Sequence, residues 1–349
     1  MPAFKFQNDD SDTIHIAACF DELMALPFLV LAESIKRSIH NKNRSTILYG
    51  IYSGNLPRYI SRISKFNTSN FTVNFIKAPA EFDNLPKSKL VTTATYIRFL
   101  LPSVLNNLDK VLYVDVDTTI VKDISYLYDT DLQGFCLGAA VDHGFTLINA
   151  NLGLKVDKNL GLNREKGVEI FSYLRDIVLM PAGTEHLYFN AGVLLIDLEL
   201  WRKLDISNRA VEFLLNTKNC IYIDQDALNS VICGKYKVLD DRWNSLAICC
   251  YDYFLSNGTA ESMSIVRQWR TDPWIVHYAG PNKPWRADRD KTPLDHYFWG
   301  VARRSFAYRR LAKLHRDSAP EETNYAEARK FPPSRWEAVL EKCRNVLGR

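Results

Sequence analysis

The sequence predicts an α/β fold with a mostly parallel central sheet, and three observations lead to this prediction. Short β-rich runs alternate with segments of helical apolar spacing along most of the chain. Hydrophobic residues make up 47% of the 349 residues, which is ample for a large buried core. No internal repeat, low-complexity tract or clear linker divides the chain. Alternation of this kind places helices on both faces of one sheet.

The first half of the chain carries the clearest alternation. A β-rich run at residues 13–20 precedes helical spacing over 23–39. The same strand and helix patterns continue at 46–52, 56–66 and 71–76, then in a helix around 95–105 and a strand at 110–114.

The second half begins with an apolar run at 135–141. Residues 143–185 are indistinct apart from helical spacing near 165–179, and we expect a flap or an acceptor-side segment there. The remaining predicted elements are a strand at 188–196, helices at 208–215 and 226–233, a strand at 274–277 and a single helix over 294–314.

The charge of the chain is concentrated near its C-terminal end. Lys and Arg number 44 against 40 Asp and Glu, and a net charge of +4 is too small to indicate nucleic-acid binding. Residues 301–316 carry six basic side chains and no acid, close to several aromatic residues. This composition suits docking on an anionic membrane surface, and it suits equally an amphipathic helix that covers the core.

Cysteine usage and the N-terminus bear on the compartment. The seven cysteines are an odd number without a C-x-x-C pair, which argues against a disulfide framework and against zinc held by cysteine. Residues 1–12 lack the apolar region of a secretory signal, and no apolar run approaches the roughly 18 residues that span a bilayer. We expect a cytoplasmic protein, with peripheral attachment to the inner face of the cytoplasmic membrane if the basic segment docks there.

Two carboxylates follow the predicted strand at 110–114. Asp115 and Asp117 are two positions apart, so an extended chain points them the same way. Open α/β sheets bind ligands at the carboxyl ends of their strands. Two oxygen ligands suit Mg²⁺ or Mn²⁺ and leave coordination positions for phosphate. Because four other D-x-D pairs occur in the chain, surface acids at a strand end are the alternative.

A histidine and a lysine flank a Gly-Pro turn further on. His277 ends the predicted strand at 274–277 and can give an imidazole nitrogen to a metal. Gly280 permits close backbone approach, and Lys283 offers an ammonium group to a phosphate. The alternative is a tight turn beside a packed histidine.

Acidic and amide side chains open the predicted helix near residue 226. Asp226 is typical of a cap or first-turn acid that opposes the helix dipole. Asp224 and Gln225 are better placed to face a cleft and to stabilise positive charge at an anomeric carbon.

Small residues precede the predicted strand at 188–196. Ala191 and Gly192 would let a ligand approach the backbone, and the amide of Asn190 can both donate and accept hydrogen bonds. A turn before a core strand is the alternative.

These stretches, in this order, resemble glycosyltransferase family 8. This retaining family includes glycogenins and the bacterial lipopolysaccharide and lipooligosaccharide galactosyl- and glucosyltransferases, and the similarity is closest to the lipooligosaccharide α-galactosyltransferase group. The resemblance extends from about residue 14 to about residue 285. It is carried by TYIR ending at 98, DVD ending at 117, FNAGVLLI ending at 196, DQDALN ending at 229 and HYAGPNKPW ending at 285.

The resemblance implies a fold and a set of site residues. The fold is a single Rossmann-like nucleotide-diphospho-sugar transferase domain of the GT-A type at 13–290, followed by a basic and aromatic helical extension at 291–349. The implied ligands of Mn²⁺ or Mg²⁺ are Asp115, Asp117 and His277, and the implied diphosphate contacts are Gly280 and Lys283. The implied donor-sugar contacts are Arg98, Asp115, Asn190, Ala191, Gly192, Asp224 and Gln225.

The first predicted strand departs from the family pattern. Ala17 and Ala18 match the nucleotide contacts of the family. Cys19 stands where the family has an acid near uracil, and Glu22 stands where an aromatic residue would stack. Asp21 is the acid that remains to serve the nucleotide.

The implied reaction is retaining transfer of galactose or glucose from UDP-galactose or UDP-glucose. The acceptor would be an oligosaccharide or a lipid-linked glycan such as lipopolysaccharide core. Because the neutral amide of Gln225 is a poor nucleophile, we expect same-face attack within an ion pair, with Gln225 and Asp224 as stabilisers. Two alternatives are a sugar nucleotidyltransferase, for which residues 17–22 lack a glycine-rich loop, and a catalytically silent UDP-sugar-binding protein.

Overall fold

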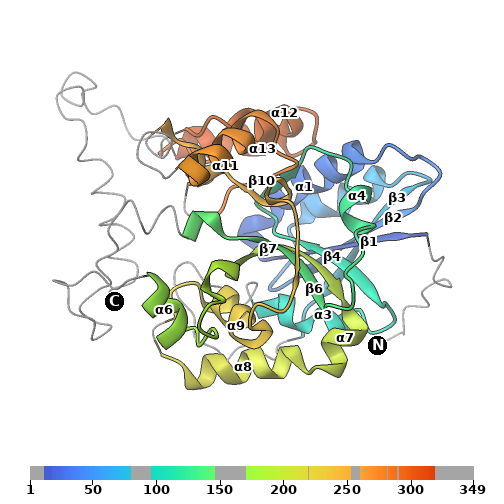
Figure 1. The fold of residues 1–349 in the computed structure, drawn as a ribbon. Helices are drawn as coiled ribbons and strands as arrows, with labels where there is room; N and C mark the ends of the chain where they lie inside the picture. Colours follow the sequence, from blue (N-terminus) through green and yellow to red (C-terminus); the bar gives the residue numbers. More distant parts are fainter. Residues whose placement is uncertain are drawn as a thin grey trace.

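A seven-stranded sheet forms the centre of the part of the chain that the structure describes (Figure 1). The computed structural model describes residues 12–79, 96–145, 170–218, 220–252, 260–280, 282–288 and 291–318. The strand order is β3-β2-β1-β4-β7-β6-β8. The strands are β1 (Ile14–Phe20), β2 (Thr46–Tyr52), β3 (Phe71–Lys77), β4 (Lys110–Val114), β6 (Leu137–Val141), β7 (Phe189–Asp197) and β8 (Lys237–Val238).

One strand of this sheet, β7, runs opposite to the other six. The β3, β2, β1 and β4 strands are parallel neighbours, and β6 and β8 also pair in parallel, so the predicted mostly parallel sheet is confirmed. The β7 strand is antiparallel to both β4 and β6. The amino end of β7 therefore lies beside the carboxyl end of β4, where Val114 pairs with Val193. This arrangement puts residues 190–192 next to Asp115.

A second, three-stranded sheet joins three distant parts of the chain. It consists of β5 (Thr118–Ile120), β10 (Ile275–His277) and β9 (Ser245–Leu246), of which only β10 is predicted by the sequence. His277 pairs with Thr118, and the backbone N–H of Tyr278 donates to the carbonyl of Asp117 at 2.9 Å. This sheet brings His277 to the end of β4.

Helices cover both faces of the central sheet (Figure 1). One face carries α1 (Ala25–Ser38), α4 (Ser125–Tyr128), α11 (Ala260–Thr271), α12 (Asp295–Ala302) and α13 (Tyr308–Asp317). The other carries α3 (Leu101–Val104), α7 (Leu198–Lys203), α8 (Ile206–Asn216) and α9 (Ile223–Ile232), with α6 (Ile170–Asp176) beside them. Short 3₁₀ segments are η1 (Glu22–Met24), η2 (Arg58–Phe66), η3 (Ile97–Leu100), η5 (Glu185–Leu187), η6 (Asp241–Asn244) and η7 (Ala247–Cys250).

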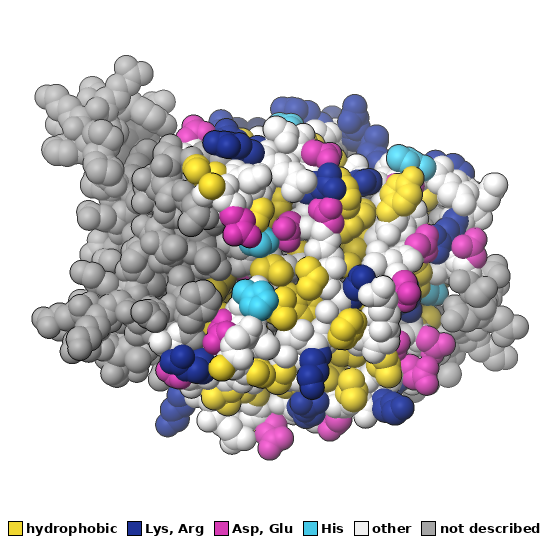
Figure 2. All heavy atoms as spheres, viewed as in Figure 1, with side chains coloured by type: hydrophobic (Ala, Val, Ile, Leu, Met, Phe, Trp, Pro, Cys, Tyr) yellow, Lys and Arg dark blue, Asp and Glu magenta, His cyan; other side chains and the backbone are white. Residues whose placement is uncertain are grey.

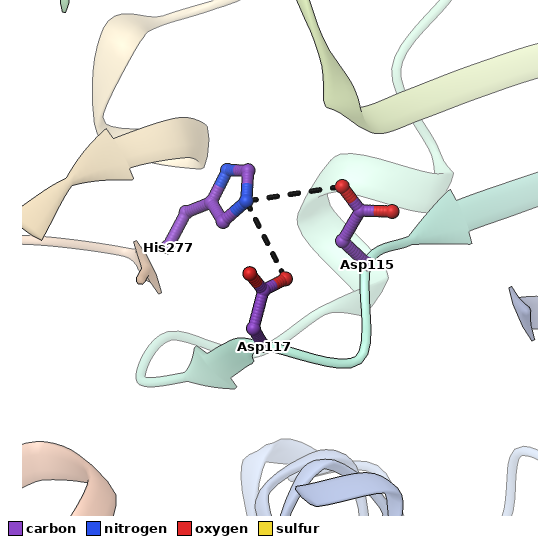
Figure 3. A group of neighbouring side chains, drawn as sticks. All are labelled: Asp115, Asp117 and His277. Carbon is purple, nitrogen blue, oxygen red and sulfur yellow. Dashed lines mark ion pairs between the residues drawn. The ribbon is translucent and has the colours of Figure 1, made fainter. Parts of the chain in front are cut away.

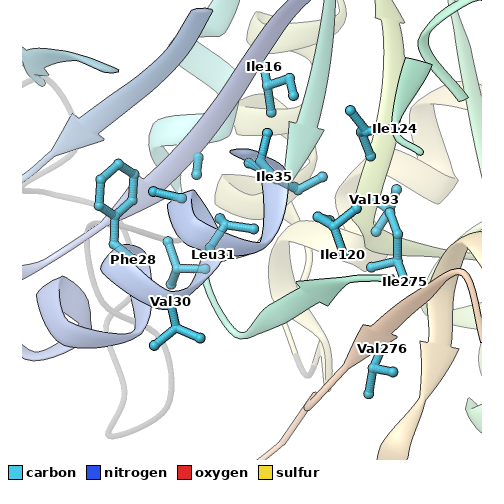
Figure 4. Packing of buried hydrophobic residues seen from close by; sticks show 14 of the residues in the cluster. Ile16, Phe28, Val30, Leu31, Ile35, Ile120, Ile124, Val193, Ile275 and Val276 are labelled. Carbon is cyan, nitrogen blue, oxygen red and sulfur yellow. The ribbon is translucent and has the colours of Figure 1, made fainter. Parts of the chain in front are cut away.

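Among the described residues the hydrophobic core has one large cluster on each face of the sheet and a smaller third cluster around α6. Along β1, Ile14, Ile16 and Ala18 belong to one cluster, whereas Ala17 and Cys19 belong to the other. This alternation is the period-two geometry of a strand that is buried on both sides. Figure 4 shows residues of the first cluster, to which α1, β1, β5, β7 and β10 contribute.

The single helix predicted over residues 294–314 is wrong. The chain forms α12 and α13, separated by a turn in which the hydroxyl of Ser305 accepts the N–H of Ala307 at 3.1 Å. The turn redirects the chain so that Leu311 on α13, like Phe298 on α12, is buried in the first core cluster. The predicted helix at 95–105 is likewise two short pieces, η3 and α3.

Some predictions concern residues outside the described ranges. Most of the expected flap at 143–185 lies there, and its described part contains α6. The boundary at residues 290 and 291 stays a prediction. Among the described helices, none combines the length and apolar composition needed to cross a bilayer.

Candidate functional site

Two carboxylates and an imidazole converge at the carboxyl end of β4 (Figure 3). The His277 Nε2 atom lies 3.8 Å from Asp115 Oδ2 and 3.5 Å from Asp117 Oδ1. One ligand atom from each residue lies within 4.8 Å of the others. The structure thus brings together the three residues that the sequence predicts as metal ligands.

This donor set fits a hard divalent cation. Carboxylate oxygens and an imidazole nitrogen are ligands that Mn²⁺ accepts, and carboxylates suit Mg²⁺. His277 Nδ1 lies 2.8 Å from the side-chain oxygen of Asn244, so its other ring nitrogen faces the carboxylates. His277 and Asp117 are 3% and 8% exposed, which keeps competing water away from most of their surface.

Gly192 makes the close approach of these groups possible. A Cβ at this position would lie 2.3 Å from His277 Cε1 and 2.9 Å from Asp115 Oδ2. No side chain fits in that space without displacing the histidine ring. The glycine predicted as a donor contact therefore also has a steric role in the metal cluster.

Lys283 places a positive charge beside Asp117. Its ammonium group contacts Asp117 Oδ2 and donates to the carbonyl of Tyr278 at 2.9 Å. Burial raises the pKa of the Asp117 carboxyl, but Lys283 and His277 lower it further than burial raises it, so the net pKa is below the ordinary value. Gly280, in the same loop, has a φ of 79° that favours glycine.

Arg98 links the metal cluster to the start of α9. Its guanidinium lies 3.0 Å from Asp115 Oδ1 and 3.0 Å from Asp224 Oδ2, and it donates to the carbonyl of Ala191 at 2.8 Å. The cation also lies 4.8 Å from the ring centroid of Tyr113. Burial acts to lower the pKa of Arg98, but Asp115 and Asp224 raise it above its ordinary value. The arginine is a fixed cation between two carboxylates.

Asp224 titrates unusually high for a carboxyl group. Burial raises its pKa to about 6, with the Arg98 cation opposing the rise and Asp115 adding to it. Its side chain is 13% exposed. Asp224 therefore changes charge in a pH range where most aspartates are already ionised.

Three neutral amides form a second group beside the metal cluster. Gln225 Oε1 accepts the N–H of Ala191 at 3.1 Å, and Asn190 Oδ1 accepts the N–H of Gly192 at 2.9 Å. Asn244 Nδ2 also donates to Asn190 Oδ1, at 2.9 Å. We call Asn190, Gln225 and Asn244 the amide cluster.

Asp142 anchors this cluster, and the sequence prediction missed it. Its Oδ2 accepts from Asn190 Nδ2 at 3.0 Å and from Gln225 Nε2 at 2.9 Å, while Oδ1 accepts the N–H of Phe145 at 2.8 Å. Asp142 directly follows β6, as Asp115 follows β4. The rule that identified Asp115, an acid at the carboxyl end of an apolar strand, would have found it. Asn244 has no comparable signal in the sequence.

Asp226 has a different environment from its expected one. It lies in the first turn of α9, as predicted, but it is fully buried and does not act as the N-cap. Its carboxylate accepts the hydroxyls of Tyr173 and Tyr188, both at 2.6 Å, and the N–H of Tyr222 at 2.9 Å. Burial raises the pKa of Asp226 despite these hydrogen bonds. We assign it to the architecture of the helix start.

The β1 segment carries the residues predicted to contact the nucleotide. Ala17 and Ala18 are buried within β1, and their nucleotide role stays a prediction. The Asp21 carboxylate caps η1 by accepting the N–H groups of Leu23 at 3.0 Å and Met24 at 3.2 Å. Cys19 is 6% exposed, and burial raises the pKa of its thiol.

The fold and this arrangement define a glycosyltransferase of the GT-A type. Residues 15–289 match the family model described as "Glycosyl transferase family 8". Because the match covers most of the chain, the protein belongs to this family, and the predicted family is confirmed.

Relatives of known name support the same assignment. General stress protein A of Bacillus subtilis is 25% identical over 295 residues, which cover 82% of this chain and 92% of the relative. Lipopolysaccharide 1,3-galactosyltransferase of Salmonella typhimurium is 27% identical over 219 residues, or 62% of this chain and 56% of the relative. This chain thus matches only about half the length of the Salmonella enzyme.

Solved structures show the same fold. The galactosyltransferase LgtC, in complex with donor and acceptor sugar analogs, has a TM-score of 0.59 and is 25% identical, covering 91% of this chain and 99% of LgtC. The bifunctional glycosyltransferase WbbM has a TM-score of 0.76 at 20% identity, covering 89% of this chain and 53% of WbbM. The likeness to WbbM concerns the fold alone.

Proposed function

We propose that this protein transfers galactose or glucose from a UDP-sugar to a carbohydrate acceptor of the cell envelope, with retention of configuration. The observation that carries the proposal is the convergence of Asp115, Asp117 and His277 beside Lys283 in a chain of this family. Relatives named for hexose transfer to lipopolysaccharide, from Salmonella typhimurium and Escherichia coli, support the choice of sugar and acceptor.

The charged residues would serve the leaving diphosphate. Asp115, Asp117 and His277 would hold Mn²⁺ or Mg²⁺, which supplies electrostatic stabilisation of the developing phosphate charge. Lys283 adds a positive charge within contact of Asp117. Gly280 would permit the backbone to approach the diphosphate, and Ala17, Ala18 and Asp21 are the proposed contacts of the nucleoside.

The residues around Arg98 would bind the donor sugar. Arg98, Asn190, Ala191 and Gly192 meet at one point beside Asp115 and Asp224. A sugar placed there would find carboxylate and amide oxygens as acceptors and backbone groups at close range. We therefore keep all of them as proposed donor contacts.

The geometry of Gln225 favours same-face attack within an ion pair. Its oxygen accepts from Ala191 and its nitrogen donates to Asp142, so the amide is held by hydrogen bonds at both ends. A neutral amide so held stabilises positive charge at the anomeric carbon better than it attacks it. The negative charge on Asp224 would add to this stabilisation.

The variant Gln225→Glu tests this mechanistic proposal. We expect it to slow transfer without accumulating a glycosylated protein, as followed by intact mass after incubation with UDP-galactose and with UDP-glucose. A sugar adduct mapped to Asp224 would contradict the ion-pair mechanism.

The proposed activity itself is tested without knowledge of the acceptor. We expect slow UDP release from one UDP-hexose in the presence of Mn²⁺, lost with EDTA and in Asp117→Ala. Asp131→Ala is the matched control, because Asp131 belongs to another D-x-D pair and its side chain accepts the exposed backbone N–H of Gln133. UDP binding without release from any donor would instead support the silent UDP-sugar-binding protein, for which the capping role of Asp21 is the favourable observation.

The basic segment at 303–316, which comprises the turn after α12 and most of α13, is the proposed contact with an anionic membrane carrying lipid-linked acceptors. Lys and Arg side chains gather along the upper edge of the molecule in Figure 2, where α12 and α13 lie in Figure 1. Phe306, in the turn between these helices, and Tyr308, the first residue of α13, are 36% and 37% exposed. We expect sedimentation with anionic liposomes to fall in Arg309→Glu/Lys313→Glu; unchanged sedimentation would remove this part of the proposal.

A further inference from the structure

The amide cluster and Asp142 form a continuous buried chain of hydrogen bonds that ends at a metal ligand. The order of the chain is Gln225, Asp142, Asn190, Asn244 and His277, with side-chain distances of 2.9, 3.0, 2.9 and 2.8 Å. All five residues are at most 8% exposed. Water therefore has little access to replace a missing partner.

The donor and the acceptor of each hydrogen bond from Gln225 to His277 can be assigned without reference to hydrogen positions. The N–H groups of Ala191 and Gly192 can only donate, so the atoms they reach on Gln225 and Asn190 are oxygens. The nitrogens of these two amides then point to Asp142, whose two carboxylate oxygens can only accept when ionised. Every hydrogen bond at Asp142 is consistent with this assignment.

The assignment continues to the histidine. Asn190 Oδ1 already accepts from Gly192, so the neighbouring atom of Asn244 must be its donating nitrogen. Asn244 then presents its oxygen to His277 Nδ1, which must carry the proton. A neutral imidazole protonated at Nδ1 has a free electron pair at Nε2, the nitrogen that faces Asp115 and Asp117.

We propose that Asn244 is a positioning residue that holds His277 with a proton-free Nε2, and that Asn190 and Asp142 connect this histidine to Gln225. Asn244 reaches His277 at Nδ1 and not at the ligand atom Nε2, and its other hydrogen bond goes to Asn190 Oδ1, so it acts on the metal site through the ring it orients. The functional meaning rests on the proposed metal-dependent transfer. The tautomer itself does not, because it follows from the hydrogen bonds alone.

The first test measures the tautomer in the unmodified protein. We expect ¹³C and ¹⁵N ring shifts of His277, assigned by their loss in His277→Gln, to report Nδ1–H in metal-free protein at a pH where the ring is neutral. A proton on Nε2 in that state overturns the proposal. This measurement needs neither a donor sugar nor an acceptor, so it stays decisive if the proposed reaction is wrong.

The second test compares two replacements of Asn244 by their affinity for Mn²⁺ in the presence of UDP. Asn244→Leu removes the acceptor of His277 Nδ1–H, and loss of such a partner weakens metal binding about 10- to 100-fold. Asn244→Asp keeps an acceptor for the histidine, although its carboxylate also faces Asn190 Oδ1. We expect the Asp variant to bind Mn²⁺ more tightly than the Leu variant while melting at a lower temperature, because it buries a charge beside an acceptor.

A positioning role predicts that the Asp variant binds Mn²⁺ more tightly than the Leu variant although it is less stable. A purely structural role predicts that the less stable Asp variant binds Mn²⁺ more weakly. Ser245→Ala is the matched control, because the Ser245 hydroxyl donates to the carbonyl of Arg242 and not to a residue of the hydrogen-bond chain that ends at His277. Wild-type affinity in Asn244→Leu, or equal loss in both variants, would overturn the proposal. If neither variant folds, the tautomer measurement decides.

Discussion

The charged side chains of the site and its amide cluster hold their positions by different means. Two carboxylates and an ammonium group lie together beside the His277 ring, and Asp117 contacts Lys283 directly. We call Asp115, Asp117, Lys283 and His277 the charged cluster. The amide cluster carries no charge: backbone N–H groups of residues 191 and 192 together with Asp142 fix Gln225 and Asn190, and Asn244 is held between Asn190 and His277.

This difference separates two physical tasks. Opposite charges packed together can exchange partners, and a diphosphate with its cation could displace Lys283 from Asp117 at small cost. Buried amides cannot change partners without leaving a donor or acceptor unpaired, which costs about 1 to 3 kcal/mol for each group. We infer that the charged cluster responds to the ligand, whereas the amide cluster keeps its geometry.

The largest expected effect comes from removing a charge. Asp117→Ala takes away one proposed metal ligand and the partner of Lys283, and we expect metal-dependent UDP release to fall by on the order of 10³-fold. Steady-state release with Mn²⁺ measures the loss, and the circular dichroism spectrum should remain that of the wild type. Undiminished UDP release would show that Asp117 is not needed for the reaction and would contradict the metal-binding role proposed for the charged cluster.

The next effect is expected where the two clusters meet. Gly192→Ala adds a methyl group 2.3 Å from the His277 ring, so the ring must move. We expect Mn²⁺ affinity to fall by about 100-fold, the upper range for losing the orientation of a ligating histidine. Isothermal titration in the presence of UDP measures it. Gly300→Ala, at a position with open space around it and without a positive φ, controls for the general cost of replacing a glycine; equal losses in both variants would contradict the steric role.

A smaller effect is expected within the amide cluster. Asp142→Asn offers one oxygen to the three donors that the carboxylate accepts, from Asn190, Gln225 and Phe145. We expect kcat/KM for the donor to fall about 10- to 100-fold through misplacement of Gln225. A fall confined to thermal stability, with unchanged kcat/KM, would show that the amide cluster is structural only.

The smallest effect is a dependence on pH that arises at Asp224. Its pKa is raised to about 6, and the Arg98 pair exists only when the carboxyl is ionised. Donor binding should therefore weaken by up to about tenfold per pH unit below 6. Because the folded-state pKa lies above the unfolded value near 4, the folded state takes up the proton first, and stability should rise as pH falls from 6 to 4.

Donor affinity and thermal unfolding across this pH range check the two opposite slopes. Asp224→Asn should remove the slope in stability that this residue contributes and flatten the acid limb of donor binding. A variant that keeps both slopes would assign the titration to another group.

Sequence reasoning was most successful where a pattern is local. The strand at 110–114 and the strand at 46–52 are observed with the predicted bounds, because a continuous apolar run between polar turns leaves few other conformations. The helix at 294–314 was predicted as one element because its aromatic and basic periodicity continues across a turn at 303–307. The short strands β5 and β9 escaped notice, since two or three residues carry no period.

The same distinction applies to the site. Asp115, Asp117 and His277 could be predicted because their residue types and motifs indicate binding of a divalent metal ion without knowledge of the fold. Asn244 could not, because an asparagine becomes a histidine partner only when β9 and β10 pair beside β5. Asp142 lay between these cases: its place after a strand was visible, but its three donors come from separate segments.

The sequence by itself determined which side chains carry charge, which segments are strands or helices, and to which family the protein belongs, because these follow from residue type and local period. Only the tertiary structure decided which of those side chains have a structural role and which lie in the site. Asp226 is hydrogen-bonded to two tyrosines, Asp224 lies beside Arg98, and Gln225 is linked to His277 through the Asp142 carboxylate and two buried amides. The physical reason is that a polar atom's role depends on the partner that reaches it when water is excluded, and that partner usually lies on another element.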